Sequence, residues 1–159
     1  MTRDCVKTLV AQQVTIVSGG ARGIDTVAHE AALDFGGLTW VVLGGGHYEL
    51  YPAQNENLFR EIVQSGGLLI SEYPPYARVQ KYTFPERNRL IAALSQRLIL
   101  AQAHERSGSL STARAALDLG RDIFVLKPLA QDENFAGSER LISLGARCFV
   151  APQELSTKA

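Results

Sequence analysis

A glycine-rich turn between a strand-like run and a helix-like run is the feature that most constrains this chain. Residues 18–25, here called the first loop, read Ser-Gly-Gly-Ala-Arg-Gly-Ile-Asp; they follow the β-branched run 14–17 and open an apolar-periodic stretch that reaches residue 35. Glycines let backbone N–H groups approach a phosphate closely, and a helix start adds partial positive charge. An arginine in the loop adds a full charge and a planar fork. The turn therefore predicts an anion site built from Ser18, Gly19, Gly20, Arg22 and Gly23.

A simpler interpretation of the first loop stays open. Ser18 stands where the dinucleotide-binding pattern G-x-G-x-x-G has its first glycine, so the match is a weak one. A turn of this kind can also serve only to close a strand-to-helix corner. Asp25 is expected to be a first-turn helix residue favoured by the helix dipole rather than a catalytic acid.

Apolar runs and helical patterns alternate along the whole chain. The strand-like runs cover residues 14–18, 38–43, 68–71, 97–101, 123–126 and 148–150, and the helical patterns cover 5–12, 23–35, 55–65, 86–94, 112–119 and 137–144. Continuous apolar strands separated by helices indicate a parallel sheet covered on both faces. We predict one α/β domain over residues 1–159: a Rossmann-like three-layer domain with a mainly parallel sheet, whose ligand site lies at the carboxyl ends of the strands.

Composition excludes several classes of protein. With 16 basic and 16 acidic side chains in 159 residues, no global field attracts the chain to nucleic acid or to a membrane, so binding of a polyanion must come from local clusters. Cys5 and Cys148 lie far apart and in no C-x-x-C spacing, which favours a reducing compartment. Neither a signal peptide nor an apolar run of transmembrane length is visible. The expected location is the cytoplasm, with no membrane partner.

A second cluster mixes basic and aromatic residues. The predicted binding residues there are Lys81, Phe84, Arg87, Asn88 and Arg89, and three tyrosines lie in or just before this segment, at positions 73, 76 and 82. Cations beside aromatic rings suit single-stranded nucleic acid, since the cations bind phosphates and the rings stack on bases. The alternative is a solvated helix start, with Pro85 and Glu86 placed as the first turn prefers.

The third cluster again lies between a strand and a helix. In residues 107–112, here called the third loop, hydroxyls and free N–H groups predict a second phosphate cradle made by Ser107, Gly108, Ser109 and Thr112. Any one of these serines can equally be a helix N-cap. Nucleophilic catalysis lacks support because the chain has no G-x-S-x-G elbow.

Metal and cofactor sites are not predicted. Asp25 and His29 share a helix face but lack a third ligand, and neither H-E-x-x-H nor a Walker A lysine loop is present. We expect no metal, no cofactor and no catalytic residue.

Many short sequence blocks follow one another in order from about residue 14 to residue 150. They include Ser18-Gly19-Gly20-Ala21-Arg22-Gly23-Ile24-Asp25, Leu43-Gly44-Gly45-Gly46, Tyr51-Pro52, Ser71-Glu72-Tyr73-Pro74-Pro75, Phe84-Pro85-Glu86-Arg87-Asn88-Arg89 and Ser107-Gly108-Ser109-Leu110. Together these blocks resemble the DprA/Smf family of DNA-processing proteins. The resemblance implies a non-catalytic protein of natural transformation that binds single-stranded DNA, forms a homodimer and helps load the recombinase RecA.

The resemblance also implies roles for individual residues. Arg22 and Lys81 would bind phosphate, Phe84 would pack on a base, and Gly108 would allow close approach of the backbone. Whether Arg87 and Arg89 touch DNA or brace the pocket stays open. Relative to the family pattern, we expect this chain to lack the opening strand with its Gly-Ser-Arg loop and to have no winged-helix domain after Ala159.

Two other functions remain as alternatives. One is a phosphoribohydrolase-like enzyme of the same fold type, although residues 106–114 lack the carboxylate that such chemistry needs. The other is a sensor that binds a small nucleotide without turning it over. The basic and aromatic segment 73–89 favours single-stranded DNA over both, because a mononucleotide needs only one stacking surface.

Overall fold

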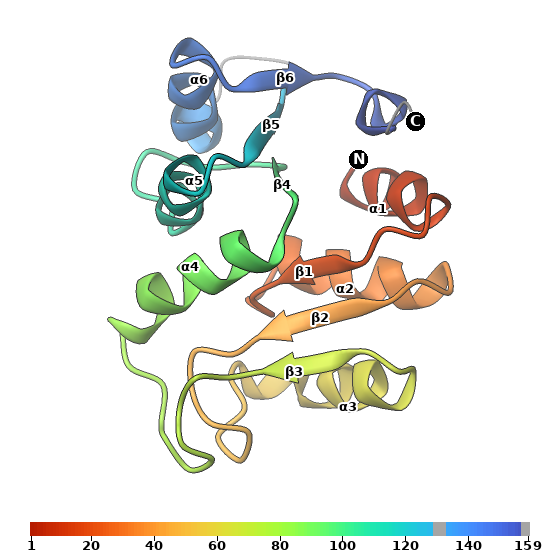
Figure 1. The fold of residues 1–159 in the computed structure, drawn as a ribbon, viewed down its shortest axis with the longest axis vertical. Helices are drawn as coiled ribbons and strands as arrows, with labels where there is room; N and C mark the ends of the chain where they lie inside the picture. Colours follow the sequence, from red (N-terminus) through yellow and green to blue (C-terminus); the bar gives the residue numbers. More distant parts are fainter. Residues whose placement is uncertain (129–132, 157–159) are drawn as a thin grey trace.

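Strands and helices alternate along the chain as the apolar pattern predicts (Figure 1). The computed structural model describes residues 1–128 and 133–156. Its strands are β1 (Ile16–Ser18), β2 (Thr39–Val42), β3 (Leu68–Ile70), β4 (Arg97–Leu100), β5 (Asp122–Leu126) and β6 (Arg147–Phe149). The α-helices are α1 (Thr2–Val10), α2 (Ile24–Asp34), α3 (Glu56–Gln64), α4 (Thr83–Leu94), α5 (Ser109–Asp118) and α6 (Ala136–Ser143), and the short 3-10 turns are η1 (Ala53–Asn55), η2 (Glu133–Phe135) and η3 (Pro152–Leu155).

The strands form two parallel sheets of three strands each. The first has the order β1-β2-β3, with Val17 opposite Trp40 and Trp40 opposite Leu68; the second has the order β4-β5-β6. Our prediction of a parallel α/β fold is confirmed, but the expected single sheet is divided. In the described part of the chain, no hydrogen-bonded ladder joins β1 to β4. The half-buried side chains of Ile16 and Ile99 pack on one shared apolar cluster instead.

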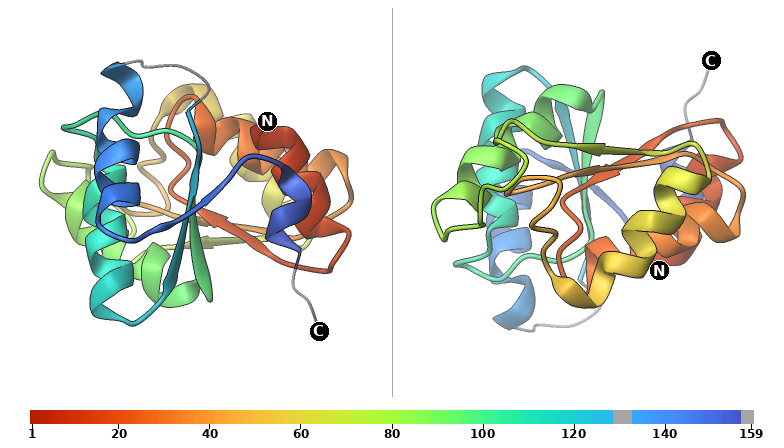
Figure 2. Two further views of the ribbon diagram at one scale, coloured as in Figure 1. Left: turned by 90° about the horizontal axis from the view of Figure 1, so that it is seen from above. Right: turned by 90° about the horizontal axis from the view of Figure 1, so that it is seen from below.

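Helices flank both sheets, as a three-layer arrangement requires (Figure 2). On the first sheet, α2 and α3 pack from one side, where Val41 meets Phe59 and Ile62. From the other side, α4 contacts β1 and β2. The second sheet lies between α5 with α6 on one side and α1 with η3 on the other. Burial on both faces explains why the strands read as continuous apolar runs.

The helix α4 is the element that connects the two halves. Its buried Ala92 belongs to the core cluster of the second half, together with Leu100 and Val125. Its N-terminal turns lie beside the carboxyl ends of β1 and β2 (Figure 1). Residues of α4 therefore reach both the first and the third loop, which follow β1 and β4 respectively.

Candidate nucleotide-binding site

The first loop is held by the side chain of its own last residue, Asp25. The Asp25 carboxylate accepts hydrogen bonds from the backbone N–H groups of Gly19, at 3.2 Å, and Ala21, at 3.1 Å. Gly20 has φ +70°, and a Cβ on it would lie 2.7 Å from the Phe59 ring, so both conformation and space require glycine there. Because a carboxylate already engages two of its amides, this loop leaves anion recognition mainly to its arginine.

Arg22 projects from the first loop toward the turn η1. Its Nη2 donates to Gln54 Oε1 at 2.9 Å, and the side chain is exposed to solvent. The Asn55 side-chain amide donates to the Gly20 carbonyl at 2.9 Å and so attaches the same turn to the loop. An exposed guanidinium held by one neutral partner keeps its charge available for an anion.

Arg87 of α4 is buried under the same loop. Its Nη1 donates to the carbonyl of Gly19 at 2.8 Å and to the carbonyl of Val42, at the ends of β1 and β2. Burial lowers the pKa of this guanidinium, and the nearby charge of Asp25 opposes that shift. Within the part of the chain that the structure describes, no ion pair involves Arg87, so its positive charge is directed at neutral carbonyls.

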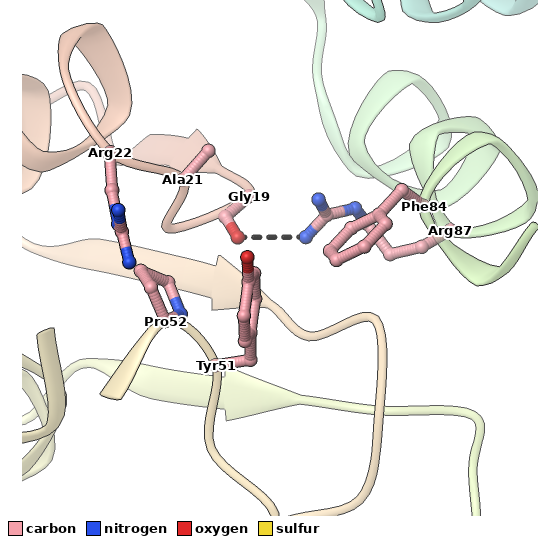
Figure 3. Close-up of a pocket in the computed structure, with 7 residues that line it drawn as sticks. All are labelled: Gly19, Ala21, Arg22, Tyr51, Pro52, Phe84 and Arg87. Atoms are coloured by element: carbon pink, nitrogen blue, oxygen red, sulfur yellow. Dashed lines mark hydrogen bonds between the residues drawn. The ribbon is translucent and has the colours of Figure 1, made fainter. Parts of the chain in front are cut away.

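These residues surround a pocket of about 300 Å³, here called the first-loop pocket. It is lined by Gly19, Ala21, Arg22, Tyr51, Pro52, Phe84 and Arg87. Figure 3 shows Arg22 on one side, Phe84 and Arg87 on the other, and Tyr51 between them. The rings of Tyr51 and Phe84 lie with centroids 5.7 Å apart and planes inclined by 54°. Two cations and two aromatic rings around one pocket match the phosphate and the base of a nucleotide.

Some predicted residues meet at this pocket and others do not. Gly19, Arg22, Phe84 and Arg87 line it, whereas Lys81 is exposed at the approach to α4 and does not. Arg89 turns away, because its Nη2 pairs with the Glu72 carboxylate at 2.5 Å on the surface. Arg87 therefore braces the pocket as well as lining it, while Arg89 braces only the neighbouring loop.

Asn88 connects the third loop to α4. Its side-chain amide donates to the Gly108 carbonyl at 3.2 Å and to Ser111 Oγ at 2.8 Å. Ser107 and Ser109 bond to each other through their hydroxyls at 3.2 Å. The residues predicted as a second cradle, Ser107, Gly108, Ser109 and Thr112, do not line the first-loop pocket, and Thr112 is buried.

Tyr51 and Pro52 line the pocket although our residue analysis assigned them no role. They lie in the connection between β2 and η1, where no strand or helix period places a side chain. The signal available in the sequence was the Tyr51-Pro52 pair among the blocks that resemble the DprA/Smf family. An aromatic residue in an irregular loop beside a glycine run is the feature that could have identified them.

The histidine that shares a helix face with Asp25 has a structural role. His29 is fully buried, and its Nδ1 lies 2.7 Å from Thr39 Oγ1, which itself donates to the Ile16 carbonyl. The hydroxyl therefore accepts from Nδ1, and the buried Nε2 has no hydrogen-bond partner in the described part of the chain. Burial lowers the pKa of His29 to about 4; Asp25 opposes this shift and Arg87 adds to it.

The described residues also bear on metal sites and on membrane spans. Among residues 1–128 and 133–156 no cluster of three or more His, Cys, Asp or Glu side chains is placed to hold a metal ion. Nor does any helix in that part of the chain have the length and apolar character needed to cross a bilayer.

Comparison with known proteins identifies close sequence relatives. The family model described as DNA recombination-mediator protein A matches residues 1–159. Protein Smf of Escherichia coli is 42% identical over 149 residues, which is 94% of this chain and 40% of that protein. The DNA processing protein DprA of Streptococcus pneumoniae is 41% identical over 143 residues, 90% of this chain and 50% of that protein. The chain thus spans about half the length, or less, of these curated relatives.

Solved structures agree with these matches. The chain is similar to the DprA structure of Streptococcus pneumoniae with a TM-score of 0.87 and 38% identity, covering 97% of this chain and 54% of that one. DNA processing protein A of Helicobacter pylori, whose structure is described for its single-stranded DNA binding mode, matches with a TM-score of 0.86 and 35% identity, covering 96% of this chain and 69% of that one. A molybdenum cofactor carrier protein from Chlamydomonas reinhardtii, 16% identical, shares the fold alone, with a TM-score of 0.60 over 96% of this chain and 79% of that one. On this sequence and structural similarity, the chain belongs to the DNA recombination-mediator protein A family, as the resemblance to DprA/Smf proteins predicts.

Proposed function

We propose that this chain binds single-stranded DNA and that the first-loop pocket holds one nucleotide of the strand. The observation that carries the proposal is the convergence of Arg22 and Arg87 with the rings of Tyr51 and Phe84 on about 300 Å³. Arginine supplies the phosphate contact and a ring supplies the stacking surface. Duplex DNA keeps its bases stacked inside the helix, so a pocket of this kind favours a single strand.

The printed description of the Helicobacter pylori relative supports the same ligand, since it concerns binding of single-stranded DNA. Lys81, two residues before the start of α4, is exposed where a strand leaving Phe84 would pass. We assign it a phosphate contact outside the pocket, as the family resemblance implies.

We further propose binding without catalysis. The carboxylate closest in sequence to Arg22 is Asp25, and its Oδ2 already accepts from two loop amides. A phosphoribohydrolase needs a free carboxylate to assist glycosidic cleavage. Incubation with adenosine monophosphate separates the two functions, because turnover that depends on Arg22 would contradict a binding role.

Fluorescence anisotropy with oligo-dT and a matched duplex tests the central proposal. We expect preference for the single strand, with log affinity falling against log salt by about 0.7 per phosphate contact. Arg22→Ala should remove most of this affinity, and Phe84→Ala should weaken it by about 1–3 kcal/mol, the usual effect of one stacked base. Arg3→Ala, which removes the same charge from the exposed surface of α1, where Arg3 pairs with Asp34 at the C-terminal end of α2, is the matched control.

Two outcomes would contradict the proposal. A folded wild-type chain that binds neither oligo-dT nor the matched duplex would exclude the proposed binding of single-stranded DNA. Equal affinity for adenosine monophosphate and for a long oligonucleotide would favour the small-nucleotide sensor instead, because a strand should gain from contacts beyond one base.

We also propose the wider role that the family resemblance implies: a cytoplasmic homodimer that helps load RecA onto single-stranded DNA. The wide spacing of Cys5 and Cys148, which favours a reducing compartment, supports the cytoplasmic location. Leu144 and Val150 are exposed apolar residues near α6 and β6, where we place the dimer contact. Light scattering of Leu144→Lys against wild type tests the dimer. The rate of RecA assembly on oligo-dT, with and without the chain, tests loading.

Residues 1–159 are proposed to fold as one domain. The shared helix α4 and the cluster that joins Ile16 with Ile99 connect the two sheets. A single cooperative unfolding transition, reported equally by Trp40 fluorescence and by circular dichroism, is the expected result.

A further inference from the structure

A second hollow adjoins the first-loop pocket and shares one wall with it. This hollow, here called the Tyr48 cleft, has a volume of about 500 Å³, and its lining includes Tyr48, Tyr51, Glu49, Arg60 and Arg78. Tyr51 lines both hollows. A DNA strand that is bound in the first-loop pocket therefore meets the Tyr48 cleft where it passes the Tyr51 ring.

The cleft presents aromatic surface to solvent. Tyr48 is 69% exposed and Tyr76 is 74% exposed, yet their rings lie together with centroids 4.8 Å apart and planes inclined by 30°. Two large rings that contact each other outside the core add little to stability, so their exposure indicates a binding surface. Tyr48 lines the cleft while Tyr76 supports its ring from outside it.

Backbone contacts hold the ring pair in place. The Tyr48 N–H donates to the Pro75 carbonyl at 2.9 Å, and the Gly46 N–H donates to the Ala77 carbonyl at 2.8 Å. A Cβ on Gly45 would lie 2.9 Å from the Ala77 carbonyl oxygen, so the two loops approach closely. A stacking surface on such a support loses little conformational entropy when a base binds.

Charge in the cleft favours a base over a phosphate. Arg78, with 81% of its side chain exposed, lies 3.8 Å from the Glu49 carboxylate, and Arg60 pairs with Glu56 at 2.6 Å. The two arginines and two glutamates balance, so the cleft attracts no phosphate by net charge. The two ion pairs instead present donors and acceptors whose remaining hydrogen-bonding capacity can serve the edge of a base.

We infer that the Tyr48 cleft takes a second base of the same DNA strand, stacked on Tyr48, with the backbone passing over Tyr51 from the first-loop pocket. The inference rests on the proposed function, because it adds a subsite to the same ligand path. It predicts a footprint longer than one nucleotide and aromatic contacts at two separate places.

Anisotropy with fluorescent dT12 tests the second subsite. Tyr48→Ala should weaken binding by about 5- to 150-fold, the loss expected for one stacked base. Tyr48→Phe keeps the ring and should bind as the wild type does. Because Tyr48 is largely exposed, neither substitution removes core packing, and thermal unfolding of each variant checks this directly.

Photo-cross-linking locates the base. With 5-iodouracil placed at successive positions of dT12 and the cross-linked residue identified by mass spectrometry, at least one position should cross-link to Tyr48 or Tyr76, and another to Phe84. Wild-type affinity in Tyr48→Ala, or cross-links confined to the first-loop pocket, would overturn the second subsite while leaving the proposed function standing. Absence of dT12 binding by the wild-type chain would overturn the proposed function itself.

Discussion

The first and third loops look alike in sequence and differ in the molecule. Each joins a strand to a helix through glycine and small residues. Of the two loops, however, only the first contributes residues to the first-loop pocket. Around the first loop lie the buried ionisable residues Arg87 and His29, whereas the buried polar residues of α5 and α6 are the hydroxyl-bearing Thr112 and Ser138. A glycine turn becomes a candidate site through what the rest of the fold places opposite it, here Tyr51 and Phe84.

Removing the buried guanidinium should have the largest effect, and it should act at the first loop and at the end of β2. Arg87→Ala leaves the carbonyls of Gly19 and Val42 without this donor and opens a cavity, so we expect a loss of about 2–4 kcal/mol in the free energy of unfolding. Denaturant titration measures it. Arg89→Ala, which removes a surface arginine two residues away, should have a much smaller effect; equal losses would show that the guanidinium of Arg87 does not brace the loop.

Acid should destabilise the half of the molecule that contains the first loop, through protonation of His29. The pKa of His29 is lowered to about 4 in the folded chain, below its usual value near 6.5, so the unfolded chain binds the extra proton. The contribution of neutral His29 to the free energy of unfolding is complete above about pH 6.5. It is lost as the pH falls toward 4, by up to about 3 kcal/mol. Unfolding free energies measured from pH 7.5 to pH 4 should show this slope.

The matched control for acid is His29→Gln, since it keeps a hydrogen-bonding side chain but cannot titrate in this range. Its stability should depend less on pH over the same interval. An unchanged pH slope would assign the acid sensitivity to other groups.

Adding one methyl group to each loop compares the two directly. A Cβ on Gly19 would lie 2.6 Å from the Arg87 guanidinium, so Gly19→Ala should cost about 1–3 kcal/mol in stability by overpacking. On Gly108, whose φ is −56°, a Cβ meets nothing within 4 Å, and Gly108→Ala should leave stability nearly unchanged. If Gly108→Ala nevertheless weakens oligo-dT binding, DNA passes close to the third loop, as the family resemblance implies.

The smallest expected effect is on the attachment of the third loop. Asn88→Ala removes its hydrogen bonds to the Gly108 carbonyl and Ser111 Oγ, together with the Oδ1 atom that accepts from Arg87 Nε at 3.2 Å, and should lower stability by about 1–2 kcal/mol. Oligo-dT binding, measured under conditions where the variant is folded, should change less than in Arg22→Ala. A larger loss of binding would extend the site to the third loop.

Most of the fold could be predicted from the sequence because local pattern and burial agree along the chain. The strands fall within one or two residues of the apolar runs, and α2 and α3 begin and end within one residue of their predicted bounds. The helix α4 begins at Thr83, three residues before the prediction, because Pro85 is accepted in the first turn and Thr83 Oγ1 bonds to the Gln80 carbonyl. Division of the sheet could not be predicted, since periodicity carries no information on which strands pair.

The site could be predicted only where a residue type was unusual for its place. Arg22 in a glycine turn and Phe84 beside basic residues are such cases, and they line one pocket. The burial of Arg87 depends on a contact across the fold, between positions 87 and 19, which no local pattern reports. The hydrogen bonds of Asp25 to the loop amides are local, but they depend on the conformation of the glycine turn, which the sequence pattern does not specify.

Two consecutive residues of α4 contact both halves of the molecule. Arg87 and Asn88 are consecutive residues, and the first binds the ends of β1 and β2 while the second binds the start of α5. These hydrogen bonds, together with the cluster that contains Ile16 and Ile99, hold the two sheets relative to one another. Phe84 lies about one turn before Arg87 on the same helix and lines the first-loop pocket, so the pocket and the junction of the two sheets share a few residues of α4.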